Sequence, residues 1–129
     1  MSKKRIKIFI DNTGYANDAL FAKKLAYMLA RTLPSDDVLI TTFLDLVPPH
    51  DIEVDSNNVK NTVEAISHAD IFIPVISGIY LQHIDPKISK EANIIISSNK
   101  RFVFPVLIED CDWSSYDWLV KTEIFSYQE

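Results

Sequence analysis

The chain has 129 residues, of which 47% are hydrophobic and 24% are charged, and this composition fits one globular domain and excludes a disordered chain. The net charge of −5 argues against nucleic acid or an anionic membrane as the main partner. The single cysteine excludes an internal disulfide framework and a cysteine-rich zinc site, and no apolar run reaches the roughly 18 residues of a membrane span. We therefore expect a cytoplasmic protein without a metal site.

The first half of the chain alternates between strand and helix patterns. Residues 5–10 become fully apolar toward their end, as in a strand that enters a buried sheet. From about Asp18, apolar residues recur at helical spacing, and Pro34 ends this helix. Residues 38–42 are short and β-branched and predict a second strand, whereas the acidic residues 45–57 predict a long loop.

The second half repeats this alternation. Helical spacing of apolar residues predicts a helix over residues 58–69, and an apolar run predicts a third strand over residues 71–76. Asp85 and Pro86 supply an N-cap carboxylate and a proline at the first helical position, so a further helix begins there and runs to about Ser98.

The end of the chain is less regular. Residues 102–108 are apolar and predict a fourth strand, and an aromatic and acidic tail follows. We expect Trp113, Tyr116 and Trp118 of this tail to form a satellite hydrophobic cluster that caps the last strand.

Continuously apolar strands that alternate with helices predict a parallel sheet covered on both faces. With right-handed crossovers, the expected fold class is α/β: a flavodoxin-like three-layer sandwich with strand order 2-1-3-4 and room for a fifth strand. Pro74 and Pro105 lie inside predicted strands and cannot donate to a ladder, but the apolar runs around them fit no other element.

A ligand site is expected where the winding of such a sheet reverses, beyond the carboxyl ends of strands one and three. The loops at that edge are residues 11–18 and 77–85, and they contain both glycines of the chain, Gly14 and Gly78. The glycines indicate either close approach of a ligand to the backbone or the ordinary needs of two turns.

Glu91 has an unusual place in the helix that begins at this edge. Helical periodicity puts it on an apolar stripe with Ile88, Ile94 and Ile95. A carboxylate there is costly unless it is paired, hydrogen-bonded or beside a cleft. Two interpretations stay open: a functional carboxylate at the cleft, or a helix-edge glutamate paired with Lys87.

Several segments of the chain resemble, in order, the motifs of a bacterial TIR (Toll/interleukin-1 receptor) domain. They are Ile8-Phe9-Ile10, Asp18 with Phe21 and Leu25, residues 65–72 (AISHADIF), residues 76–81 (ISGIYL), Lys90-Glu91, and residues 104–108 (FPVLI) followed by Cys111-Asp112-Trp113. Each segment is short, and the ordered set spans most of the chain. The resemblance implies one TIR-like domain over residues 1–129, and the family's usual final helix does not follow, as if the chain were the N-terminal part of a longer effector protein.

The resemblance also implies an activity. Many TIR domains assemble into oligomers and hydrolyse NAD+ to nicotinamide and ADP-ribose, or to a cyclic form. Bacterial members are often effectors of anti-phage defence, so the resemblance also implies a sensor domain, either fused to the chain or separate from it. Glu91 matches the position of the family's catalytic glutamate. Cleavage of the nicotinamide–ribose bond passes through an oxocarbenium-like state that a carboxylate stabilises, so NAD+ is the substrate and no further cofactor is implied.

The resemblance and the position of the cleft together nominate further site residues. The expected substrate-binding residues are Asp11, Asn12, Tyr15, Phe43, Ser77, Tyr80 and Lys87. The family's usual Trp and Cys before the glutamate are replaced by Lys87 and Ile88, so Tyr15, Phe43 or Tyr80 would stack on the base. Residues 45–57 match the BB loop, which implies homotypic assembly through Asp45, Pro48, Pro49 and Asp51, although the loop lacks its usual glycine.

Three other functions compete with this one. A non-catalytic TIR adaptor would associate with like domains and would not need Glu91. A nucleoside deoxyribosyltransferase-like enzyme shares the layered plan and the N-glycosidic chemistry, but the CDW ending and the loop at 45–57 favour the TIR class. A phospho-receiver domain is excluded, because it needs an aspartate at the end of strand three, where this chain has Ile76-Ser77-Gly78.

Overall fold

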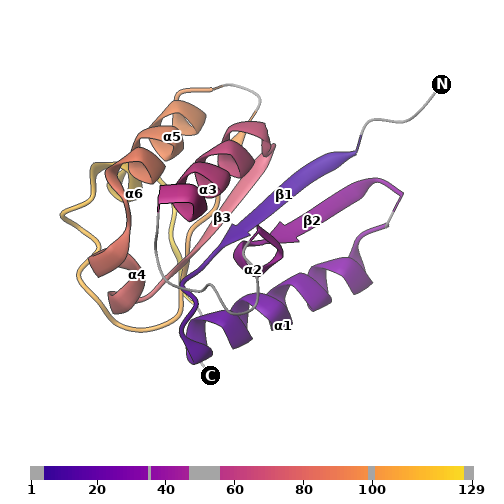
Figure 1. Ribbon diagram of the computed structural model, residues 1–129, viewed down its shortest axis with the longest axis horizontal. Coiled ribbons are helices and arrows are strands. Elements are labelled where there is room, and N and C mark those ends of the chain that lie inside the picture. Colours follow the sequence, from indigo (N-terminus) through magenta and orange to yellow (C-terminus); the bar gives the residue numbers. More distant parts are fainter. Residues whose placement is uncertain (1–4, 35, 47–55, 99–100, 127–129) are drawn as a thin grey trace.

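The computed structural model describes residues 5–34, 36–46, 56–98 and 101–126, which form alternating strands and helices (Figure 1). In chain order the elements are β1 (Ile6–Asp11), α1 (Ala16–Thr32), β2 (Val38–Thr42), α2 (Phe43–Leu46), α3 (Ser56–His68), β3 (Ile71–Ile76), α4 (Gly78–His83), α5 (Pro86–Ile96), β4 (Phe102–Val103), β5 (Val106–Leu107), α6 (Asp117–Val120) and β6 (Phe125–Ser126). The predicted strands and long helices are therefore present, with ends that differ by a few residues.

The strands form one parallel arrangement in the order β2-β1-β3-β5-β6, and β4 pairs with β3 beside β5. The register sets Ile8 of β1 opposite Ile40 of β2 and Ile71 of β3. The predicted order 2-1-3-4 is therefore present, with β4 and β5 in the place of the fourth strand, and β6 lies at the edge as a fifth strand. The predicted flavodoxin-like α/β fold is confirmed, and the fifth strand is β6.

The predicted fourth strand is not continuous. Residues 102–108 are divided into β4 and β5, and the interruption lies at Phe104-Pro105. The N–H of Phe104 donates to the carbonyl of Phe72, and that of Ile108 donates to Ile76, so alternate residues of β3 direct their backbone groups toward this strand. Pro74 lies between them in this alternation and has no N–H to donate. The ladder therefore breaks where Pro74 faces it.

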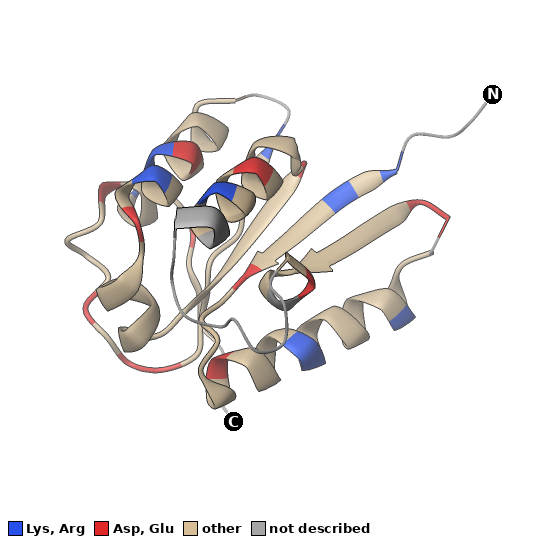
Figure 2. Cartoon of the chain, viewed as in Figure 1, with Lys and Arg blue, Asp and Glu red and all other residues tan. Residues whose placement is uncertain are grey.

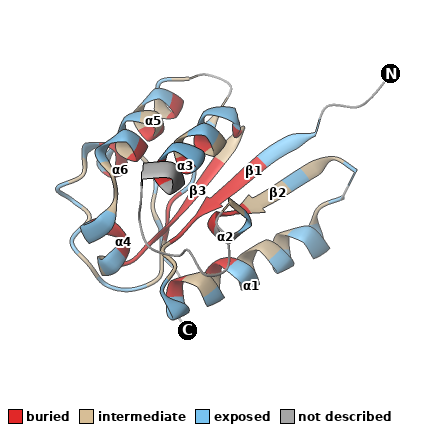
Figure 3. Cartoon of the chain, in the orientation of Figure 1, coloured by how far each residue is buried: buried red, intermediate tan, exposed pale blue. Residues whose placement is uncertain are grey.

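Side chains alternate between the two faces of the sheet. Ile8, Ile10, Ile73 and Val75 pack with Ala22 of α1 on one face. On the other face, the buried residues of the strands and of α3, α5 and α6 form a larger core: Phe9, Ile66, Phe72, Ile76, Ile88, Ala92, Ile95, Trp118 and Leu119. The period of two along each strand thus builds a layer of helix on each side (Figures 1 and 3).

The aromatic tail is part of this larger core. Trp118 is 2% exposed and its ring stacks on Phe72 with a centroid distance of 6.4 Å. Trp113 and Tyr116 pack against the same cluster. The prediction of a separate satellite cluster is therefore wrong. The tail packs through α6 against the same face of the sheet as α5, and the buried residues of both helices belong to one core.

Two predicted loops contain short helices. Ser77 accepts a hydrogen bond at Oγ from the N–H of Tyr80 and so caps α4, which occupies most of the predicted loop 77–85. In the segment 45–57, α2 extends to Leu46 and α3 begins at Ser56. Residues 47–55 lie outside the described residues.

Charged side chains are concentrated on the helices, the loops and the ends of the strands (Figure 2). The helices in the described ranges are all too short or too polar to cross a membrane. Asp85 caps α5 by accepting a hydrogen bond from the N–H of Lys87, with Pro86 at the first helical position, as predicted.

Candidate functional site

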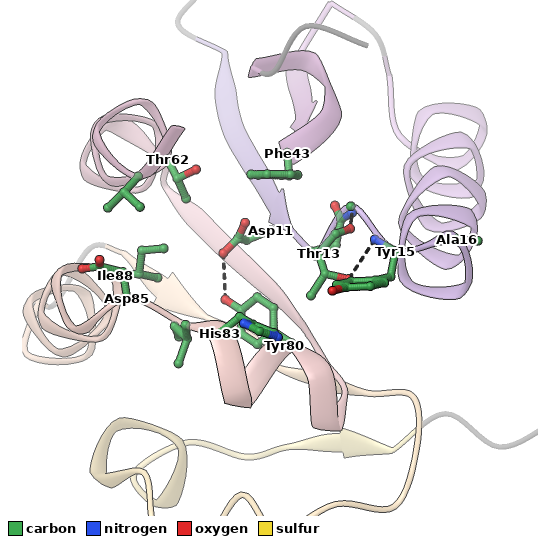
Figure 4. A pocket seen from close by; sticks show the side chains of 14 residues that line it. Asp11, Thr13, Tyr15, Ala16, Phe43, Thr62, Tyr80, His83, Asp85 and Ile88 are labelled. Carbon is green, nitrogen blue, oxygen red and sulfur yellow. Dashed lines mark hydrogen bonds between the residues drawn. The ribbon is translucent and has the colours of Figure 1, made fainter. Parts of the chain in front are cut away.

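A cavity of about 770 Å³ opens at the carboxyl edge of β1, beside the loops after β1 and β3 (Figure 4). The described residues that line it are Asp11, Asn12, Thr13, Gly14, Tyr15, Ala16, Phe43, Val59, Thr62, Tyr80, His83, Ile84, Asp85 and Ile88. Ligand pockets of α/β sheets lie at this kind of edge, and the volume is that of a typical small-molecule site.

Asp11 and Tyr80 form a buried polar pair in the lining of the cavity. The hydroxyl of Tyr80 donates a hydrogen bond of 2.8 Å to Oδ2 of Asp11, and both residues are buried (Figure 4). Burial raises the pKa of Asp11 to about 7, although the hydrogen bonds from Tyr80 and from the backbone of Asn12 oppose the shift. Burial and the neighbouring carboxylate raise the pKa of Tyr80 well above its usual value.

Asn12 adds an unsatisfied acceptor beside this pair. Its Nδ2 donates to the carbonyl of Thr13 at 2.6 Å, while its Oδ1 is buried and has no partner among the described residues. A buried acceptor without a donor costs free energy, and native proteins have few of them. The carboxylate of Asp11 thus lies at the floor of the cavity, and the amide oxygen of Asn12 is buried beside it.

A second polar network fixes the loops that carry these residues. Oδ2 of the buried Asp18 accepts hydrogen bonds from Oγ1 of Thr13 at 2.7 Å and from Oγ of Ser77 at 2.6 Å. Ser77 in turn accepts from the N–H of Tyr80. The network ties the loop after β1 to α1, to the end of β3 and to α4, so the position of Tyr80 depends on Ser77 and Asp18.

Aromatic rings form part of the cavity wall. Tyr15 stacks on His83 with a centroid distance of 6.4 Å and an interplanar angle of 25°. Phe43 is buried and lines the cavity from the end of β2 (Figure 4). Flat rings of this kind suit a planar ligand group.

The charge of the lining is unbalanced. Two carboxylates, Asp11 and Asp85, line the cavity, and none of its described residues is Lys or Arg. Oδ1 of Asp85 is already engaged by the N–H of Lys87. The cavity is therefore suited to an uncharged or cationic group and unsuited to a phosphate.

The structure brings together five of the eight residues nominated for catalysis and substrate binding. Asp11, Asn12, Tyr15, Phe43 and Tyr80 line the cavity.

The other three are not among its described lining residues. Ser77 is buried in the network that caps α4. Lys87 is exposed on the first turn of α5, and Glu91 is half-buried one turn beyond Ile88, which does line the cavity.

The predicted apolar stripe around Glu91 is partly wrong. Ile94 is 48% exposed, whereas Ile88, Ala92 and Ile95 are buried. The buried face of α5 is therefore centred to one side of Glu91, and the glutamate lies at its edge. The prediction failed because periodicity in an isoleucine-rich helix gives several equivalent apolar directions, and only packing selects one.

Sequence reasoning missed several wall residues. Val59 and Thr62 come from α3, His83 is the last residue of α4, Asp85 is the N-cap of α5, and Ile88 comes from α5. The sequence feature that could have identified His83, Asp85 and Ile88 was the loop 77–85 together with the helix start that follows it. For α3 the signal was weaker: a helix that leads into β3 must begin at the same edge as the loop after β1.

The residues nominated for assembly are only partly described. The carboxylate of Asp45 accepts hydrogen bonds from the N–H of Thr42 at 2.7 Å and from its Oγ1 at 3.2 Å, which stabilises the turn from β2 into α2. Pro48, Pro49 and Asp51 lie outside the described residues.

The two glycines serve different purposes. Gly14 lines the cavity, whereas the N–H of Gly78 donates to the carboxylate of Glu109 at 2.6 Å. Neither has a positive φ. A methyl group on Gly78 would make only ordinary contact with Glu109, at 3.4 Å. Gly78 therefore begins α4, and its N–H is engaged by Glu109.

The chain matches no family model and no curated protein. In the described ranges, His, Cys, Asp and Glu side chains form no group of three that could hold a metal ion.

Proposed function

We propose that this protein is an NAD+ glycohydrolase of the TIR class, with Glu91 as the catalytic carboxylate. The observation that carries the proposal is the cavity at the edge of β1, which has aromatic walls, acceptors on its floor and no described Lys or Arg. The same edge is where the sequence motifs implied a substrate site, and α5, the helix of Glu91, begins there.

The proposed reaction needs little from the protein beyond one carboxylate. The bond between C1′ of the ribose and the pyridinium nitrogen breaks, and its electron pair stays on nicotinamide, which leaves as a neutral molecule. Water adds to C1′ and releases a proton, which gives ADP-ribose. A carboxylate beside the ribose stabilises the oxocarbenium-like state and holds the hydroxyl groups.

The geometry of α5 is compatible with this role for Glu91. The Cα–Cβ bonds of a helix tilt toward its N-terminus, which for α5 is the end where Asp85 and Ile88 line the cavity. One turn of helix separates Ile88 from Glu91, about 4.5 Å along the axis. The exposed Lys87 lies outside the cavity, where the pyrophosphate of NAD+ would remain in water.

The test is NAD+ consumption by the purified chain at high protein concentration, with and without a crowding agent, and detection of ADP-ribose or its cyclic form. Glu91→Gln should abolish the activity. Glu123→Gln is the matched control, since Glu123 is an exposed glutamate outside the described lining. Undiminished turnover by Glu91→Gln would refute the assignment of the catalytic residue.

The alternative function is a non-catalytic adaptor that associates with like domains. The position of Glu91 outside the described lining of the cavity is the observation that favours it. An adaptor would show no NAD+ consumption under either condition, and Glu91→Gln would leave its oligomer distribution in sizing chromatography unchanged.

A further inference from the structure

The floor of the cavity has a chemistry that the proposed reaction does not use. Asp11 and Asn12 are 3% and 2% exposed, and both line the cavity. Oδ1 of Asn12 is buried and has no donor among the described residues. The carboxylate of Asp11 accepts from two donors, the hydroxyl of Tyr80 and the backbone of Asn12, and its two oxygens have about four lone pairs. Acceptors thus outnumber donors at the floor.

The walls restrict what can satisfy these acceptors. Phe43 and Tyr80 contribute aromatic rings to the lining, and so does the stacked pair of Tyr15 and His83. The described lining lacks Lys and Arg, so an anionic group would meet two carboxylates and no fixed cation. A planar ring that carries N–H groups meets every condition: it stacks on the rings, donates to the acceptors and brings no negative charge.

We propose that Asp11 is the specificity-determining residue of the cavity, and that it selects a planar nitrogen heterocycle with N–H donors over an isosteric ring with a carboxylate. This inference rests on the proposed function and deepens it, because NAD+ contains two such rings. The carboxamide of nicotinamide and the amino group of adenine offer the same donor chemistry. The corresponding acid, nicotinate, is ionised and offers no donor.

Ionisation of Asp11 then controls ring binding. Its carboxyl group is a stronger acceptor of N–H donors when it is deprotonated and both oxygens accept, and its pKa of about 7 puts this change near neutrality. The other titratable groups among the described lining residues are Tyr15, Tyr80, His83 and Asp85. Of these, His83 stacks on Tyr15 in the cavity wall, so its contribution needs its own control.

The experiment is calorimetric titration of the full chain with free nicotinamide, nicotinate and adenine between pH 6 and pH 8.5. We expect nicotinamide or adenine to bind more tightly as the pH rises through about 7, and nicotinate to bind at least about tenfold more weakly than nicotinamide at pH 8. Asp11→Asn should abolish the pH dependence. If both rings fail to bind, or if nicotinate binds as well as nicotinamide, the inference is wrong.

Tyr80→Phe gives a sharper version of the test. The Tyr80 hydroxyl lowers the pKa of Asp11, so its removal should move the midpoint of ring binding to higher pH. Tyr116→Phe is the matched control, because the Tyr116 hydroxyl donates to the carbonyl of Leu81 and does not contact Asp11. His83→Gln should leave the midpoint in place. A midpoint that moves with His83→Gln and not with Tyr80→Phe would assign the pH dependence to His83 and overturn the role of Asp11.

This titration does not depend on turnover. Ring binding without NAD+ consumption would support the selectivity of the floor and refute the proposed hydrolase. NAD+ consumption without discrimination between nicotinamide and nicotinate would support the hydrolase and overturn the inference.

Discussion

The hydroxyl of Tyr80 and the carboxylate of Asp11 are 69 residues apart in sequence and 2.8 Å apart in the fold. The bond joins the end of β1 to α4, the helix that follows β3, across the point where the sheet changes its winding direction. Changes at this bond should therefore alter both ligand binding in the cavity and the stability of the domain.

Asp11 should make the protein less stable as the pH rises. Its pKa is about 7 in the folded state and close to 3.8 in the unfolded chain, so between these values the folded state binds more protons. The contribution of Asp11 to the free energy of unfolding is highest below about pH 4. It then falls by roughly 1.4 kcal/mol per pH unit, several kcal/mol in total, until the pH passes about 7. In urea denaturation, Asp11→Asn should flatten this slope and be more stable than the parent at pH 8. If stability falls with pH as steeply in Asp11→Asn as in the parent, the raised pKa of the buried Asp11 carboxyl group is contradicted.

The capping network should respond to loss of Ser77. Ser77→Ala removes the N-cap acceptor of α4 and a donor to the buried Asp18, so we expect a loss of about 1–3 kcal/mol. Ser114→Ala is the control, since the Ser114 hydroxyl makes an exposed local bond to Asp112 and its loss should cost under about 0.5 kcal/mol. Equal losses in the two variants would argue against a structural role for the network.

Trp118 should be one of the largest contributors to the core. Replacing a fully buried tryptophan by alanine leaves a cavity, and Trp118→Ala should cost about 3–5 kcal/mol in chemical denaturation. The exposed Val120 on the same short helix provides the comparison, and Val120→Ala should change stability by less than about 0.5 kcal/mol. A small effect at Trp118 would mean that the tail packs outside the main core after all.

Lys87 should contribute to the binding of NAD+ through the pyrophosphate and should not affect the binding of the free rings. If the pyrophosphate lies outside the cavity beside the start of α5, Lys87→Ala should raise KM for NAD+ about two- to fivefold, with less difference at high salt. Free nicotinamide should bind the variant as it binds the parent. The neighbouring exposed Lys90 serves as the control, and an equal effect of Lys90→Ala would show that only net charge matters.

The sequence was sufficient for the fold and for the edge of the sheet that holds the cavity. Continuous apolar strands such as Ile71–Ile76 have one stable environment, a sheet covered on both faces, and the chain order of strands then limits the topology. The division of the fourth strand was harder to foresee. It depends on which neighbour Pro74 faces, and this is a property of pairing and not of local pattern.

The site was predictable only in part, for a similar reason. Asp11, Asn12 and Tyr80 were found because they belong to loops at the switch point. The pairing of Asp11 with Tyr80 could not be derived, because it depends on the short helix α4, which turns a predicted loop toward β1. The face on which Glu91 lies could not be fixed either, since the isoleucines of α5 offered more than one apolar direction.

The most direct test of the proposed function is nicotinamide release from NAD+ by the purified chain as its concentration is raised, compared with Glu91→Gln under identical conditions. We predict release that increases more steeply than the protein concentration, as expected of an enzyme that acts after assembly, and none from the variant. Release that persists in Glu91→Gln, or no release from the parent at any concentration, would contradict the proposal.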